Sequence, residues 1–194
     1  MLRYAVLIGA AIQLVGILSY TRTTLQGITR PNRVTWLMWS IAPLVAAAAA
    51  FASGVTWAAV PVFMSGFAPL LVFLASFVNR NSFWKLTAFD YLCGLLSLFA
   101  LVLWWLTKNP NLAIVFAMAG DGSAAVPTLV KGWTHSETET LAPFATGIVN
   151  AISSFFAIRV WNFASYAFPV YLTVLNVLLV FIISWRREPM RPPS

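Results

Sequence analysis

Long apolar runs separated by short polar stretches dominate this sequence. A helix of about 20 residues crosses a hydrocarbon core about 30 Å thick, and runs of this length are typical of membrane-spanning helices. Seven runs of 17 to 23 residues are present, at 4–20, 34–53, 56–78, 86–106, 111–130, 141–160 and 166–185. The pattern therefore predicts an all-α integral membrane protein with seven transmembrane helices.

Two parts of this pattern admit another interpretation. Segment 4–20 follows Arg3, as the apolar part of a cleaved signal peptide does, but no small-x-small cleavage motif precedes the next polar loop. Segments 34–53 and 56–78 are separated by only three residues, and together they are too long for one spanning helix. We expect a spanning helix in the first case and a tight hairpin in the second.

Composition supports a membrane protein. Hydrophobic residues make up 60% of the 194 residues, and only 9% are charged, against about 25% in soluble domains. The formal charge of +7 is typical of nucleic-acid binding as well as of membrane anchoring. The basic residues lie singly or in small groups between apolar runs, which favours anchoring, so the expected partner is the lipid bilayer and not nucleic acid. Self-association into a homo-oligomer is left open.

Basic residues also predict the orientation of the chain. Alternate ends of the seven segments carry unequal numbers of Lys and Arg, three against nine. The poorer side holds Arg3, Lys108 and Arg159, and the richer side holds Arg22, Arg30, Arg33, Arg80, Lys85, Lys131, Arg186, Arg187 and Arg191. Because basic loops stay in the cytoplasm, we expect the N-terminus outside and the C-terminus inside.

A short internal match suggests a duplication. Gly27, Thr29 and Thr35 recur as Gly132, Thr134 and Thr140 at an offset of 105 residues. Both copies fall on the predicted cytoplasmic side, so two parallel three-helix units need one linking helix between them. The sequence predicts a first unit over 1–78, a linker helix in 79–110, a second unit over 111–185 and a cytoplasmic tail over 186–194.

This arrangement, with Pro127-Thr128-Leu129-Val130-Lys131 near the cytoplasmic end of the fifth segment, resembles the PQ-loop and SWEET transporter superfamily. The resemblance implies transport by alternating access, with Pro127 as a hinge, in a divergent bacterial-type member of the cytoplasmic (inner) membrane. Thr128 stands where the family has Gln, and the first segment has no proline, so the second hinge of the family is missing.

Asp121 is the one acidic residue at the centre of a predicted span. An ionised carboxylate at that depth costs about 2.5–3.5 kcal/mol, so it should face the bundle or a water-filled cavity. No basic residue is expected at the same depth to pair with it. Asp121 is therefore a candidate for proton coupling or substrate binding, and a structural carboxyl that joins helices is the alternative.

Other polar residues share this depth or lie near it. The candidate substrate-binding residues are Gln13, Asp121, Asn150, Ser153, Thr173 and Asn176, together with Trp39. Most tryptophans fall at segment ends, as membrane-interface residues do, and Trp36 and Trp39 are the expected exceptions. Hydrogen bonds that only hold helices together are the competing explanation for each amide. Asn176 also resembles the sugar-contacting asparagine of SWEET proteins, but its counterpart at an offset of 105 is Leu71.

The remaining polar residues are given structural roles. Asp90 is expected to form an ion pair with Lys85 or Arg80 at the interface, and Glu139 to lie in a solvated turn. No metal site and no cofactor is expected.

Taken together, these observations predict a small-solute transporter, with transport coupled to protons left open. An intramembrane enzyme is disfavoured because the spans contain no histidine and no nucleophile motif. A non-transporting sensor or structural protein is the alternative.

Overall fold

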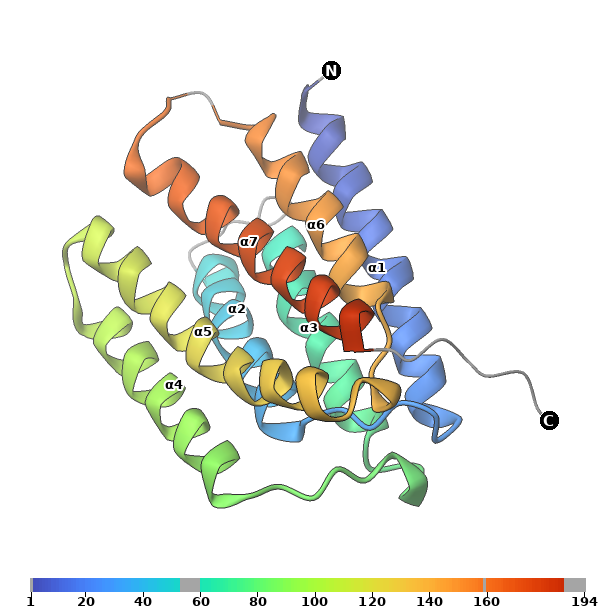
Figure 1. Ribbon diagram of the computed structural model, residues 1–194. Coiled ribbons are helices and arrows are strands. Elements are labelled where there is room, and N and C mark those ends of the chain that lie inside the picture. The colour runs from blue at the N-terminus through green and yellow to red at the C-terminus, as the bar shows by residue number, and fades with distance from the viewer. Residues whose placement is uncertain (1, 53–59, 159, 187–194) are drawn as a thin grey trace.

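The computed structural model describes residues 2–52, 60–158 and 160–186. Within these ranges all long elements are α-helices, and no strand is present. The seven α-helices are α1 (Leu2–Leu25), α2 (Arg33–Ala52), α3 (Val60–Ala75), α4 (Ala88–Leu106), α5 (Pro110–Thr134), α6 (Ala142–Phe155) and α7 (Phe163–Arg186), and two short 3₁₀ turns are η2 (Arg80–Ser82) and η3 (Ser136–Thr138). Figure 1 shows them as one bundle.

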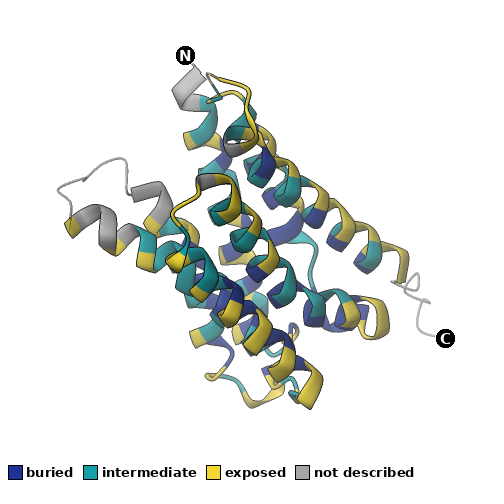
Figure 2. Cartoon of the chain, turned by 90° about the vertical axis from the view of Figure 1, so that its left-hand side faces the viewer, coloured by how far each residue is buried: buried dark blue, intermediate teal, exposed yellow. Residues whose placement is uncertain are grey.

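Length and hydropathy make four of these helices candidate membrane spans. They cover Ala5–Leu25, Ala88–Leu106, Asn111–Thr134 and Ser165–Arg186. Large apolar side chains such as Val15, Leu95 and Val174 lie on the outer faces of these helices and are more than 60% exposed, and Figure 2 shows exposed residues running along the outside of the bundle. Apolar surface on this scale requires a lipid environment. The prediction of an all-α membrane protein is confirmed at this level.

Helix lengths depart from the predicted segments in several places. The segment predicted over 141–160 forms a helix only to Phe155, because the chain turns there and Asn162 then caps the start of α7 by accepting hydrogen bonds from the backbone N–H and hydroxyl of Ser165. α1 and α5 instead continue beyond their apolar runs, to Leu25 and Thr134. The hairpin predicted around 53–55 lies outside the described residues.

The helices pack in two groups that meet along their sides. α1 and α2 both pack against α3, and α5 and α6 both pack against α7. Between the groups, α1 packs along α6 and α2 packs along α5. α4 lies at the edge of the bundle in Figure 1, against α5 and α2.

Glycines allow the close contact between α1 and α6. A Cβ at Gly16 would overlap Thr146 Oγ1 and lie 2.7 Å from the Ala142 carbonyl, and a Cβ at Gly9 would overlap Ser153. Small residues on facing helices permit such an approach in membrane bundles. The side of α6 that carries Thr146 and the predicted site residue Ser153 is therefore a packing face.

The bounds of corresponding helices in the two groups are separated by a different number of residues from the 105 of the sequence match. α1 ends at Leu25 and α2 begins at Arg33, whereas α5 ends at Thr134 and α6 begins at Ala142, so the bounds correspond at 109 residues. The matched glycines also differ in conformation, because Gly27 has a φ of 79° in a turn and Gly132 lies within α5. The match at 105 residues therefore does not align structurally equivalent positions.

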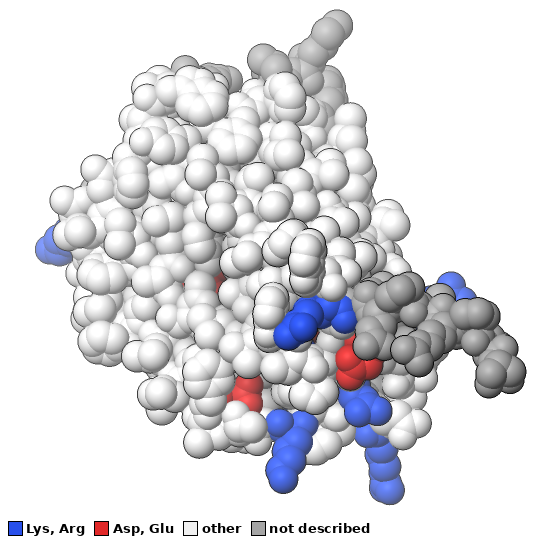
Figure 3. Space-filling model, in the orientation of Figure 1, with Lys and Arg blue, Asp and Glu red and all other residues white. Residues whose placement is uncertain are grey.

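The loops 26–32, 76–87 and 135–141 meet at one end of the bundle, here called the loop end. Asn79 Nδ2 donates to the Leu25 carbonyl, and the Arg30 N–H donates to the Thr138 carbonyl. Figure 3 shows most of the Lys and Arg residues of the visible face gathered at this lower end of the view.

Asp90 corrects one prediction at this end. Its Oδ1 accepts from Asn32 Nδ2 at 2.6 Å, and its Oδ2 accepts from the Thr87 N–H at 2.6 Å and the Thr87 hydroxyl at 2.7 Å. The expected ion pair with Lys85 or Arg80 does not form, because Asn32 and the N-cap residue Thr87 supply donors to both oxygens. Asp90 thereby joins the start of α2 to the start of α4.

Candidate functional site

A cavity of about 430 Å³ lies between the two helix groups, with walls from α1, α2, α3, α5, α6 and α7. We call it the central cavity. Five of the predicted substrate-binding residues line it, namely Gln13, Trp39, Asp121, Asn150 and Asn176. Most of the remaining wall is apolar or aromatic, as in small-molecule sites generally. The described residues that line it include no Lys, Arg or His.

Asp121 is held by contacts from two neighbouring helices. The Tyr171 hydroxyl of α7 donates to Asp121 Oδ2 at 2.8 Å, and Trp39 Nε1 of α2 donates to the Asp121 carbonyl at 3.3 Å. Gly122 makes room for the tyrosine, since a Cβ there would lie 3.2 Å from the Tyr171 hydroxyl. No hydrogen bond or ion pair from a described residue reaches Asp121 Oδ1.

The amides of Gln13 and Asn176 each use their nitrogen to bond a helix backbone. Gln13 Nε2 donates to the Pro143 carbonyl at 3.4 Å, and Asn176 Nδ2 donates to the Leu172 carbonyl at 2.8 Å. A carbonyl oxygen only accepts, so these bonds fix which end of each amide is the nitrogen. Gln13 Oε1 is buried without a hydrogen-bond partner among the described residues.

Three predicted functional residues lie outside the wall of the central cavity. Ser153 faces Gly9 at the contact of α1 with α6, and its hydroxyl donates to the Asn150 carbonyl at 2.7 Å. The Thr173 hydroxyl donates to the Pro169 carbonyl at 2.8 Å. Pro127 is buried within α5, which continues as one helix to Thr134. Because proline has no N–H, the helix lacks one backbone bond at that turn.

Aromatic rings form the part of the cavity wall nearest the loop end. Trp36 and Trp39 stand edge to face with ring centroids 5.4 Å apart, and Tyr20 packs on Trp36 at 4.8 Å. Phe144 meets Tyr20 from α6 at 6.5 Å. The expectation that Trp36 is not an interface tryptophan is confirmed, because it is only 2% exposed, whereas Trp105 and Trp185 at helix ends are about 70% exposed.

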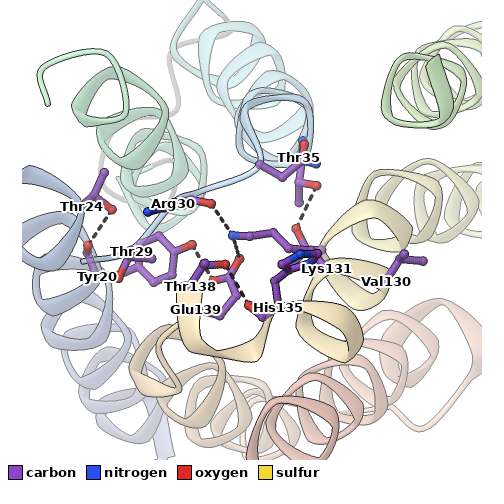
Figure 4. Close-up of polar contacts among 12 residues, drawn as sticks. Tyr20, Thr24, Thr29, Arg30, Thr35, Val130, Lys131, His135, Thr138 and Glu139 are labelled. Atoms are coloured by element: carbon purple, nitrogen blue, oxygen red, sulfur yellow. Dashed lines mark hydrogen bonds and ion pairs between the residues drawn. The ribbon is translucent and has the colours of Figure 1, made fainter. Parts of the chain in front are cut away.

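Beyond these rings lies a buried polar group that we call the loop-end cluster, formed by the side chains of Tyr20, Lys131 and Glu139 and the backbone carbonyl of Arg30 (Figure 4). Lys131 Nζ is 2.6 Å from Glu139 Oε1 and also donates to the Arg30 carbonyl. The Tyr20 hydroxyl donates to Glu139 Oε2 at 2.6 Å. Glu139 is 1% exposed, so the expectation that it lies in a solvated turn is wrong.

The cavity and the loop end differ in burial. Tyr20, Trp36, Thr128, Lys131 and Glu139 are at most 2% exposed, whereas the cavity residues Gln13, Asp121, Asn150 and Asn176 keep partial exposure. Thr128 Oγ1 also donates to Thr35 Oγ1 at 3.0 Å, which joins α5 to α2 beside the cluster. The bundle is thus tightly packed between the cavity and the loop end.

Sequence reasoning missed Tyr171 and the pairing of Lys131 with Glu139. Tyr171 lies five residues before Asn176 in an apolar run, and its hydroxyl was an available signal because a phenol within a membrane needs a hydrogen-bond partner. Lys131 and Glu139 carry no such signal, since basic and acidic residues at segment ends are usually solvated. Comparisons with protein-family models, with curated proteins and with solved structures find no match to this chain.

Proposed function

We propose that this chain is a small-solute membrane transporter that works by alternating access, with the central cavity as its solute site. The observation that carries the proposal is the position of that cavity, which lies between two helix groups, is lined by polar side chains from both and is packed closed towards the loop end. Transporters built from repeated units place their substrate at the interface of the units.

The packing of the helices supports two equivalent units. If α1, α2 and α3 are exchanged with α5, α6 and α7 in that order, each helix contact within one group becomes a contact within the other. The contact of α1 with α6 becomes the contact of α5 with α2. This is the pattern that a pseudo-two-fold axis between two three-helix units produces, and α4 is then the linker between them. It favours the PQ-loop and SWEET-like arrangement with seven spans.

Alternating access requires that the loop end opens. In the proposed cycle the cavity exchanges solute with the far side while the loop-end cluster is closed, and movement of α5 relative to α1 and α2 opens the cytoplasmic side. Pro127 lies one residue before Thr128, which contacts Thr35. A missing backbone bond at this point of α5 makes bending there easier.

The test is a reversible disulfide that joins α2 to α5 at the loop end. Thr35 and Thr128 are replaced by cysteine in a Cys93→Ala background, where the 3.0 Å contact of their hydroxyls brings the new thiols close. Proteoliposomes are screened for uptake of radiolabelled amines, amino acids, sugars and nucleosides. We expect the reduced protein to take up solutes of one class. Oxidation should lower the rate of this uptake at least tenfold, and a reductant should restore it.

Each single cysteine variant is the matched control, because it cannot form the bridge and should respond to neither reagent. The proposal is wrong if no solute accumulates above protein-free vesicles. It is also wrong if the oxidised double variant, with its disulfide verified by mass spectrometry, transports as fast as the reduced one.

A further inference from the structure

The central cavity is lined by side chains with hydrogen-bonding atoms that the described residues leave unused, among them oxygens of Gln13, Asp121 and Asn176 and the nitrogens of Trp36 and Asn150. Gln13 and Asn176 direct their amide nitrogens to backbone carbonyls, which leaves Gln13 Oε1 and Asn176 Oδ1 without a donor among the described residues. Asp121 Oδ1 likewise receives no hydrogen bond from a described residue, since Tyr171 donates to Oδ2. Three of the helices that line the cavity therefore carry a side-chain oxygen without a donor among the described residues.

The same cavity lacks a positive charge of its own. None of its described lining residues is basic, and Lys131, at the loop end, is bound to Glu139 and the Arg30 carbonyl. A buried carboxylate without a cation is costly, so an ionisable group at this depth normally has a partner. A ligand that brings a positive charge supplies what the described wall lacks, and its N–H groups can donate to the unused oxygens.

Aromatic rings lie beside the carboxylate. Trp39 reaches the backbone of Asp121 through its indole nitrogen, and Trp36 packs against Trp39. Phe144 and Phe168 add two more rings to the wall. Such faces attract cations and also cover the apolar body of a ligand.

We propose that the central cavity binds a protonated amine that carries an apolar or aromatic group, with its ammonium at Asp121 and its body against Trp36 and Trp39. This inference rests on the proposed function for its biological meaning, but the binding site stands on the geometry alone. An anionic solute would meet Asp121 without a basic residue in compensation. A sugar could donate hydroxyl hydrogen bonds to these oxygens, but it would bring no positive charge to offset the Asp121 carboxylate.

The experiment compares three probes of similar shape that differ in charge. They are 2-phenylethylamine, which is a cation at neutral pH, the neutral 2-phenylethanol and the anionic 3-phenylpropionate, each titrated calorimetrically into the purified full-length protein. We expect the amine to bind at least tenfold more tightly than the alcohol, and the carboxylate to bind more weakly than both. Equal binding of amine and alcohol by the wild-type protein would overturn the proposal without any variant.

Two variants then assign the preference to one carboxylate. Asp121→Asn keeps the shape of the side chain, and it should reduce binding of 2-phenylethylamine at least tenfold while binding of 2-phenylethanol changes little. Glu137→Gln is the matched control, because Glu137 is exposed in the loop over 135–141 and its charge lies outside the cavity. A preference for the amine that survives Asp121→Asn, or that Glu137→Gln removes, contradicts the proposed site.

The result separates this inference from the proposed function. If amines fail to bind while vesicles accumulate another solute, and the disulfide between positions 35 and 128 blocks that uptake, the proposed solute class is wrong but the proposed transport function holds. If Asp121→Asn weakens binding of the amine but no solute crosses the vesicle membrane, the proposed binding site holds and the proposed transport function is wrong.

Discussion

At the scale of single residues, the two acidic side chains Asp121 and Glu139 inside the bundle differ in their partners. Glu139 receives Lys131 and the Tyr20 hydroxyl, so its charge is compensated within the protein. Asp121 lines the cavity and receives one hydroxyl, from Tyr171, while its Oδ1 receives no hydrogen bond from a described residue. A compensated pair stabilises one packing arrangement, whereas an uncompensated carboxylate is available to a ligand.

The pair of Lys131 and Glu139 can be tested by a double-mutant cycle. Removing one member of a buried ion pair leaves the other charge unpaired, at a cost of about 3–5 kcal/mol, whereas replacing both by apolar residues is often close to neutral. We expect Lys131→Met and Glu139→Leu each to destabilise the protein strongly and the double variant to be more stable than either. Reversible unfolding in detergent gives the free energies of unfolding, and additive losses would contradict the buried pair.

At the scale of elements, the contact of α1 with α6 depends on the absence of side chains. Gly16 lies where a Cβ would meet the Ala142 carbonyl at 2.7 Å, and a backbone atom cannot rotate away as a side chain can. The polar residues of α6 therefore have two roles, because Thr146 and Ser153 pack on α1 whereas Asn150 lines the cavity.

Substitution of Gly16 measures this contact. Gly16→Ala should lower the free energy of unfolding by about 1–3 kcal/mol, since overpacking of a tight contact has this cost. Gly120→Ala is the matched control within α5, because its Cβ would lie 3.3 Å from the Ser97 carbonyl and the gain in helix propensity of about 1 kcal/mol offsets that approach. Equal stability of the two variants would show that α1 and α6 are less closely packed than described.

At the scale of the whole molecule, the loops 26–32, 76–87 and 135–141 share one end with most of the described basic residues. The helices run alternately towards and away from that end (Figure 1), so every second loop of the chain lies there. If this end faces the cytoplasm, as the charge distribution predicts, the loop-end cluster is the cytoplasmic closure of the proposed transporter.

Labelling from the two sides of the membrane tests this orientation. In a Cys93→Ala background, cysteine is placed at Arg30 in the first loop or at Trp161 between α6 and α7, and both positions are exposed. We expect a membrane-impermeant maleimide to label position 161 in intact cells and position 30 only in inside-out vesicles. The reverse pattern would invert the orientation while leaving the fold unchanged.

Properties that depend on local sequence were predicted well. The apolar runs predicted where most helices lie, because the length and hydropathy of a run depend on adjacent residues only. The sequence also singled out five polar or aromatic residues that line the central cavity, since a polar group at mid-depth must face the interior of a bundle. The match of Gly27, Thr29 and Thr35 suggested two units at an offset of 105 residues, whereas the helix bounds correspond at 109. Three identities are too few to detect a shift of four residues.

The sequence by itself determined that this protein is an apolar helical bundle with one isolated carboxylate near the centre of its fifth predicted span. Only the tertiary structure decided which groups surround that carboxylate and which charges are paired. Tyr171 lies 50 residues from Asp121, and Tyr20 lies 119 residues from Glu139. Such contacts depend on how each helix is rotated and where its neighbours approach, and the hydrophobic pattern of a single segment contains neither quantity.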